Sequence, residues 1–168
     1  GENKVQDLIK KREQLATDIK WHMIGHLQRN KVKLIAPFIY MIQSVDSINL
    51  LKTINRYAKK NNRQINCLIQ IKIGQEVSKF GFSIDAARKL LCSNYVVEYP
   101  YINICGVMGM ATFTNNETQI KKEFQSLKEI KKLIKKQHSI LSIGMSHDYK
   151  IAVQSGSNMI RIGSAVFQ

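Results

Sequence analysis

The chain has 168 residues, the length of one ordinary domain, which is enough to bury a core without disulfide or metal cross-links. Hydrophobic residues make up 44% of it and charged residues 23%, a globular composition that excludes an intrinsically disordered chain. No apolar run approaches the roughly 18 residues that a membrane-spanning helix needs. We therefore expect a soluble chain with no membrane partner.

The net charge of +14 suggests a polyanionic partner, because lysine and arginine release counterions from a phosphate backbone. The basic residues are spread along the chain, however, and the sequence contains no arginine-rich block and no known nucleic-acid motif. No specific nucleic-acid partner is expected. One function class nevertheless stays open on the charge alone: a basic module that binds nucleic acid or a protein partner.

Cysteines and histidines show no pattern of disulfides or metal ligands. Cys67, Cys92 and Cys105 lack C-x-x-C spacing, and the four histidines lack the H-E-x-x-H spacing of zinc sites. We expect no metal, and thiols that are inert core residues. Free thiols favour a reducing compartment, which predicts a cytoplasmic location and leaves a mitochondrial one open.

Short β-branched runs alternate with longer stretches of helical periodicity. The runs that predict strands are residues 21–25, 40–44, 67–73, 102–110, 140–144 and 159–162. The stretches that predict helices are residues 5–19, 47–60, 83–91 and 117–136. Ser83 is suited to cap the third helix. In the fourth, an apolar stripe leaves the lysines on the remaining face, which favours a solvated surface.

Strands that alternate with helices indicate right-handed βαβ units and a parallel sheet. A doubly wound sheet usually carries a G-x-G-x-x-G turn, and this sequence has none. Six units of about 28 residues extrapolate to roughly 225 residues for the eight units of a (β/α)8 TIM-type barrel. We therefore predict an α/β fold in which residues 1–168 form a single, partial barrel domain that supplies strands three to eight.

Loops after the last two strands of such barrels commonly bind phosphate. Here these loops carry Ser146, Gly163 and Ser164, whose amides and hydroxyls are hydrogen-bond donors at or near helix starts. They form a candidate phosphate cradle. By spacing alone, ordinary caps and turns explain the same residues and stay open as the alternative.

Several segments resemble the signatures of one family. Residues 21–31 (WHMIGHLQRNK) are similar to its W-H-x-I-G-x-L-Q-x-N-K signature, and residues 1–3 (GEN) to its F-G-E-N motif. Residues 68–70 (LIQ) and 78–81 (SKFG) resemble its L-I-Q and S-K-x-G segments. Residues 144–148 and 156–164 match G-M-S-x-D and G-S-x-x-x-R-I-G-[ST]. Because the matches occur in order along the chain, it is identified as a member of the pyridoxal phosphate homeostasis proteins, the YggS/PROSC family.

The resemblance implies a barrel like the N-terminal domain of alanine racemase, with pyridoxal 5'-phosphate (PLP) as the cofactor. It places Ser146, Gly163 and Ser164 on the phosphate, and it places three further residues around the ring: Met145 lining the site, Asn3 beside the ring and Arg161 facing the pyridine nitrogen. Since a guanidinium group can only donate, that nitrogen would remain an unprotonated acceptor and the ring a poor electron sink. The alternative for Arg161 is a salt bridge to Asp148 or Glu98.

The resemblance implies intracellular PLP homeostasis, that is, buffering or delivery of the cofactor, with no strong catalytic activity and no catalytic residue. PLP-dependent apo-enzymes are the implied recipients. A racemase-type amino-acid enzyme stays open as the second reading. Racemases of this fold use a β-rich second domain that supplies a tyrosine base, and none follows here.

The sequence departs from the family pattern at two points. The lysine that carries the cofactor in the family lies upstream of G-E-N, so it is expected before residue 1. Lys72 stands where the family usually has Asn, and strand alternation places it with Gln70 on the face that points to the barrel mouth. It could assist a phosphate or replace the missing amine, but a side chain that extends into solvent is the alternative. His22 and His26 are expected to be structural, hydrogen-bonded histidines.

Overall fold

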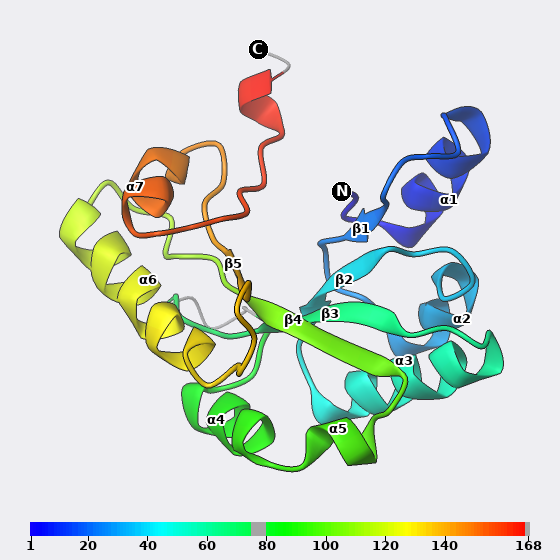
Figure 1. The fold of residues 1–168 in the computed structure, drawn as a ribbon. Helices are drawn as coiled ribbons and strands as arrows, with labels where there is room; N and C mark the ends of the chain where they lie inside the picture. The colour runs from blue at the N-terminus through cyan, green and yellow to red at the C-terminus, as the bar shows by residue number, and fades with distance from the viewer. Residues whose placement is uncertain (75–79, 167–168) are drawn as a thin grey trace.

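The computed structural model describes residues 1–74 and 80–166 of the chain. The strands of these ranges are β1 His22–Met23, β2 Met41–Val45, β3 Ile65–Gln70, β4 Ile102–Met108 and β5 Ile140–Ser142. They pair in parallel in the order β1-β2-β3-β4-β5, so each strand lies beside the next one along the chain. The sheet is curved and forms a half-barrel, which confirms the α/β, barrel-like architecture (Figure 1).

Helices connect the strands and cover one side of the sheet. Their bounds are α1 Val5–Gln14, α2 Val32–Ile35, α3 Ile48–Lys60, α4 Ile84–Cys92, α5 Tyr95–Glu98, α6 Glu117–Lys131 and α7 Tyr149–Gln154, with 3-10 turns η1 Arg29–Lys31 and η2 Ser164–Val166. In Figure 1, α3, α4, α5 and α6 surround one side of the sheet, and both chain ends lie on the other side. Side-chain oxygens of Ser47, Ser83 and Asn116 accept hydrogen bonds from backbone N–H groups at the starts of α3, α4 and α6. The cap predicted at Ser83 is confirmed.

Several predicted elements end or pair differently in the structure: the strands predicted over residues 21–25, 67–73 and 102–110 end earlier, at Met23, Gln70 and Met108. The first helix stops at Gln14, and α6 stops at Lys131, after which single turns follow. The strand predicted over residues 159–162 is wrong. Met159 makes only an isolated bridge with Ser142, the last residue of β5, so no ladder continues along residues 160–162.

Two apolar layers fill the fold. The larger one packs the outer side of the sheet against the helices and contains fully buried residues such as Ile54, Ile69 and Phe124. The smaller one is built around Met41, Leu68 and Met108 on three neighbouring strands. Burying each such side chain contributes roughly 1.5–3 kcal/mol, so the outer layer provides most of the hydrophobic stabilisation.

The strands β4 and β5 approach closely because Gly106 has no side chain. A Cβ at this position would lie 2.1 Å from the carbonyl oxygen of Ile140, far inside van der Waals contact. Gly106 pairs with Ile140 in the parallel ladder, so the residue secures the register of β5. That register determines where the loop after β5 begins.

The thiols differ in exposure. Cys67 is buried, Cys105 is half-buried and Cys92 is exposed, so the core prediction is correct for Cys67 and wrong for Cys92. Cys92 ends α4 beside the buried Leu90 and Leu91, on the side that faces solvent. Burial raises the pKa of the Cys67 and Cys105 thiols.

Within the described ranges, no helix is both long and apolar enough to cross a membrane.

Candidate functional site

A cavity of about 680 Å³ lies at the carboxyl ends of the strands. Its volume falls in the range of roughly 300–1,000 Å³ that is typical of small-molecule sites. All six residues that the sequence singles out contribute to its wall: Asn3, Met145, Ser146, Arg161, Gly163 and Ser164. Segments from both ends of the chain therefore meet at one site, as expected for a barrel whose loops cluster at one face.

The backbone next to β1 positions Asn3. Glu2 pairs in parallel with Met23, and two hydrogen bonds hold it there: its N–H donates to the His22 carbonyl at 2.9 Å, and the Ile24 N–H donates to its own carbonyl at 3.0 Å. Gly25 leaves room for the backbone of Asn3, because a Cβ on Gly25 would lie 2.2 Å from the Asn3 carbonyl oxygen. Asn3 is thus fixed at the carboxyl edge of the sheet.

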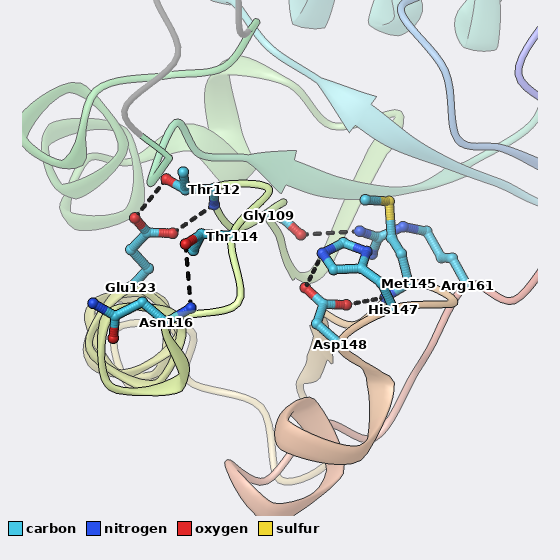
Figure 2. Close-up of polar contacts among 9 residues, drawn as sticks. All are labelled: Gly109, Thr112, Thr114, Asn116, Glu123, Met145, His147, Asp148 and Arg161. Carbon is cyan, nitrogen blue, oxygen red and sulfur yellow. Dashed lines mark hydrogen bonds and ion pairs between the residues drawn. The ribbon is translucent and has the colours of Figure 1, made fainter.

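The turn after β5 presents Met145 and Ser146 to the cavity. Gly144 has φ +99°, a left-handed conformation that favours glycine. The Asp148 side chain then folds back, and its Oδ1 accepts a hydrogen bond from the Met145 N–H at 2.6 Å. Figure 2 shows Asp148 between Met145 and His147, whose Nε2 lies 3.6 Å from Asp148 Oδ2. The buried carboxylate therefore fixes the shape of this turn.

Ser146 holds the segment that follows residue 162. Its Oγ accepts long hydrogen bonds from the backbone N–H groups of Gly163, at 3.4 Å, and Ala165, at 3.3 Å. Ser164 starts the 3-10 turn η2, and a Cβ on Gly163 would meet nothing within 4 Å. Open space beside backbone amides and two serine hydroxyls fits a phosphate group, which prefers such donors.

Arg161 spans the inner wall of the cavity. Its Nη1 donates to the Ser142 carbonyl at 2.9 Å and to Ser142 Oγ at 2.7 Å, and its Nη2 donates to the Gly109 carbonyl at 2.9 Å. These bonds go to neutral oxygens. Among the described residues, neither Asp148 nor Glu98 forms the salt bridge considered for it. Burial lowers the pKa of Arg161 to about 10, with Asp148 opposing the shift, so the group remains a cation at neutral pH. Three of its five N–H groups are thus engaged, which leaves donors for a ligand.

Polar residues on the floor of the cavity are absent from the predicted site. Gln43, on β2, lines the cavity and accepts a hydrogen bond from Ser142 Oγ at 2.7 Å. Its Nε2 lies 2.9 Å from Nδ1 of His22, which also lines the cavity. A polar glutamine and serine inside apolar strands are the signal that could have identified them. His26 is likewise hydrogen-bonded, to Asp46 at 2.9 Å, as expected.

The loop between β4 and α6 forms the outer rim. Glu123 of α6 is buried, and its carboxylate accepts hydrogen bonds from the Thr112 N–H and hydroxyl, both at 2.7 Å (Figure 2). Phe113 lies edge-on to His147, with ring centroids 4.9 Å apart, and both line the cavity. Glu123 therefore anchors a loop that contributes both to the rim and, through Gly109, to the Arg161 contact.

Two sequence expectations fall elsewhere. Lys72 is half-buried, its backbone N–H donates to the Phe82 carbonyl at 2.9 Å, and in the described part of the chain it is not a wall residue of this cavity. Gln70 is buried and donates from its side chain to the Phe80 carbonyl at 2.9 Å. Ser78 and Lys79 of the S-K-x-G segment lie outside the described residues.

Known proteins with similar sequences bear out the resemblance. Residues 1–168 match the family described as "Alanine racemase, N-terminal domain". A pyridoxal phosphate homeostasis protein of Aquifex aeolicus is 34% identical over 172 residues, covering 99% of this chain and 75% of that protein. One of Helicobacter pylori is 35% identical over 170 residues, covering 100% of this chain and 76% of that protein.

Solved structures agree with the sequence comparison. PipY of Synechococcus elongatus, solved with PLP bound, superposes with a TM-score of 0.86 at 27% identity, covering 100% of this chain and 80% of its own. Alanine racemase of Bartonella henselae gives a TM-score of 0.74 at 14% identity, covering 98% of this chain and 44% of its own, a likeness of fold alone. The chain belongs to the alanine racemase N-terminal domain family and, within it, to the pyridoxal phosphate homeostasis proteins.

Proposed function

We propose that the chain binds PLP in the cavity at the carboxyl edge of its sheet and serves in PLP homeostasis, by buffering or delivering the cofactor. The observation that carries this proposal is the convergence of Ser146, Gly163, Ser164 and Arg161 on one cavity. The relatives named for pyridoxal phosphate homeostasis, and the PLP bound to PipY, support the same ligand.

Each wall of the cavity offers a different interaction. The Ser146 and Ser164 hydroxyls provide donors for the phosphate, and the Gly163 amide, which donates to Ser146 Oγ at 3.4 Å, lies beside them. Arg161 provides a fixed cation that can only donate, suited to an unprotonated ring nitrogen. Asn3 and Met145 line the same cavity and would border the ring. When bound, PLP supplies an aldehyde that reacts with amines and a ring that withdraws electrons.

A binding role fits this wall better than catalysis does. Arg161 would disfavour protonation of a ring nitrogen held beside it, and a neutral ring withdraws electrons less strongly. The relatives that match along this chain are named pyridoxal phosphate homeostasis proteins, whereas the similarity to alanine racemase is one of fold. The racemase reading is the second candidate, and it rests on that fold alone.

The finer assignments belong to the same proposal. We infer that β1 to β5 correspond to strands three to seven of a TIM-type barrel, that the segment at Met159 takes the place of strand eight, and that residues 1–168 act as one partial barrel domain. Cytoplasmic PLP-dependent apo-enzymes are the proposed recipients.

Equilibrium dialysis against PLP, with pyridoxamine and a non-pyridine phosphate ester as competitors, tests the proposed ligand. We expect saturable binding of one PLP per chain, and a failure to saturate would contradict the proposal. Incubating the loaded protein with amino acids in deuterium oxide tests the enzyme reading, since proton abstraction labels the α-carbon even without product release. We expect little label, and rapid labelling would favour an enzyme.

A further inference from the structure

A chain of polar side chains crosses the floor of the cavity from Arg161 to His22. Arg161 Nη1 lies 2.7 Å from Ser142 Oγ, which lies 2.7 Å from Gln43 Oε1. Gln43 Nε2 lies 2.9 Å from His22 Nδ1. Ser142 and Gln43 are buried, so their polar atoms depend on one another for hydrogen bonding.

Arg161 sets the donor-to-acceptor direction of these hydrogen bonds, because a guanidinium group has no acceptor. Its N–H donates to Ser142 Oγ, and the hydroxyl proton of Ser142 then needs an acceptor of its own. Gln43 Oε1 is positioned to be that acceptor. The amide oxygen of Gln43 therefore faces Ser142, and its NH₂ group faces the opposite way.

The second hydrogen of the Gln43 amide supports the same orientation. Gln43 Nε2 also donates to Met159 Sδ at 3.2 Å, so both amide hydrogens have acceptors. Turning the amide around would place its oxygen against the sulfur, acceptor to acceptor, and would leave the buried Ser142 hydroxyl proton without Gln43 as its acceptor.

His22 is the last side chain in this series of hydrogen bonds, and it faces Gln43 with Nδ1. Because Gln43 presents an N–H to it, Nδ1 must be an acceptor, and the ring proton must sit on Nε2. A protonated imidazole would place two donors face to face. Burial also lowers the pKa of His22, and its ring stacks on Tyr40 with centroids 5.5 Å apart, so the ring is held neutral and oriented. Among the described residues Nε2 has no hydrogen-bond partner, while the side chain lines the cavity.

We propose that Gln43 relays the donor direction set by Arg161 and Ser142 to His22, and that the neutral His22 donates its Nε2–H to a non-phosphate oxygen of the bound ligand. Gln43 is then a positioning residue and His22 a binding residue. The phosphate is excluded as the acceptor because its proposed donors, Ser146 and Ser164, come from the loop after β5 and from the C-terminal segment. The ligand contact rests on the proposed PLP binding, whereas the tautomer does not.

Nitrogen NMR of the histidine side chains in the ligand-free protein at pH 7 tests the tautomer. We expect His22 with its proton on Nε2. In Gln43→Glu the amide donor becomes an acceptor, so His22 should move its proton to Nδ1 or become doubly protonated. His26, paired with Asp46, is the internal control and should not change. A wild-type His22 with the proton on Nδ1, or an unchanged His22 in Gln43→Glu, would overturn the relay.

Binding of PLP and of pyridoxal, which lacks the phosphate, tests the ligand contact. His22→Phe should weaken both ligands about fivefold to tenfold, since one neutral hydrogen bond is lost. His22→Gln places an amide N–H near the position of Nε2 and should restore most of the affinity. Equal losses in both variants, or a loss confined to PLP, would refute the contact. If wild type binds neither ligand, the proposed function fails, and the NMR result still decides the tautomer.

Discussion

Replacing Glu123 by Ala should destabilise the fold through the loop that borders the cavity. The carboxylate accepts two hydrogen bonds from Thr112 and a third from Gln119 Nε2 at 3.0 Å. Alanine leaves the Thr112 N–H and hydroxyl without this acceptor. Since Gly109 and Phe113 lie in the same loop, the change should also reach the Arg161 contact and the rim.

The expected size follows from these bonds. A hydrogen bond to a charged group contributes about 1.5–3 kcal/mol. Thr112 is half-buried, so water replaces part of what is lost, and the two bonds to Thr112 together give roughly 3 kcal/mol. For a domain of this length that loss lowers the melting temperature by roughly 6–12 °C. Glu123→Gln retains one acceptor oxygen and should lose less than half as much.

Chemical denaturation of both variants provides the measurement, and Glu117→Ala is the matched control. Glu117 also lies on α6, but its pair with Lys121, at 3.1 Å, is exposed on both sides. Such a pair contributes at most about 1 kcal/mol. If Glu123→Ala unfolds no more easily than Glu117→Ala, the carboxylate does not anchor the loop and the argument is wrong.

Other predictions concern protonation and glycine. Burial lowers the pKa of His22 in the folded protein. As the pH falls below about 6.5, the His22 imidazole therefore takes up a proton in the unfolded chain before it does so in the folded one. The free energy of unfolding should fall as the pH drops, and denaturation at pH 7 and pH 5 should show a smaller fall in His22→Gln. Gly106→Ala should prevent stable folding, because its Cβ collides with the Ile140 carbonyl; a wild-type melting curve would refute this. Gly163→Ala should melt normally but bind PLP more weakly in dialysis, since its Cβ enters only the open space of the cradle.

The sequence predicted most of the fold because its signals are local. The alternation of β-branched runs with helical stripes located all five described strands, and Ser83 marked the start of α4. The strand at residues 159–162 was wrong because pairing is not local. Whether an extended segment joins a ladder depends on where the neighbouring strand ends, and β5 ends at Ser142.

The site was predicted in part for the same reason. Ser146 was found because it lies in a loop after a predicted strand, and Arg161 because it belongs to a family motif; the structure brings both to one cavity. The floor was missed, since Gln43 and Ser142 are 99 residues apart and meet only through the register of intervening strands. His22 was expected to be hydrogen-bonded, which is confirmed, but its place in the cavity wall depends on that same register.

The ratio of PLP to pyridoxal affinity, measured by calorimetry in wild type and in Ser146→Ala/Ser164→Ala, tests the central claim most directly. Two lost hydrogen bonds to a charged phosphate, each about 1.5–3 kcal/mol, should weaken PLP by two orders of magnitude or more. Pyridoxal should bind the variant almost as it binds wild type. An equal loss for both ligands would mean that the serines only support the fold, and would contradict a phosphate cradle at this site.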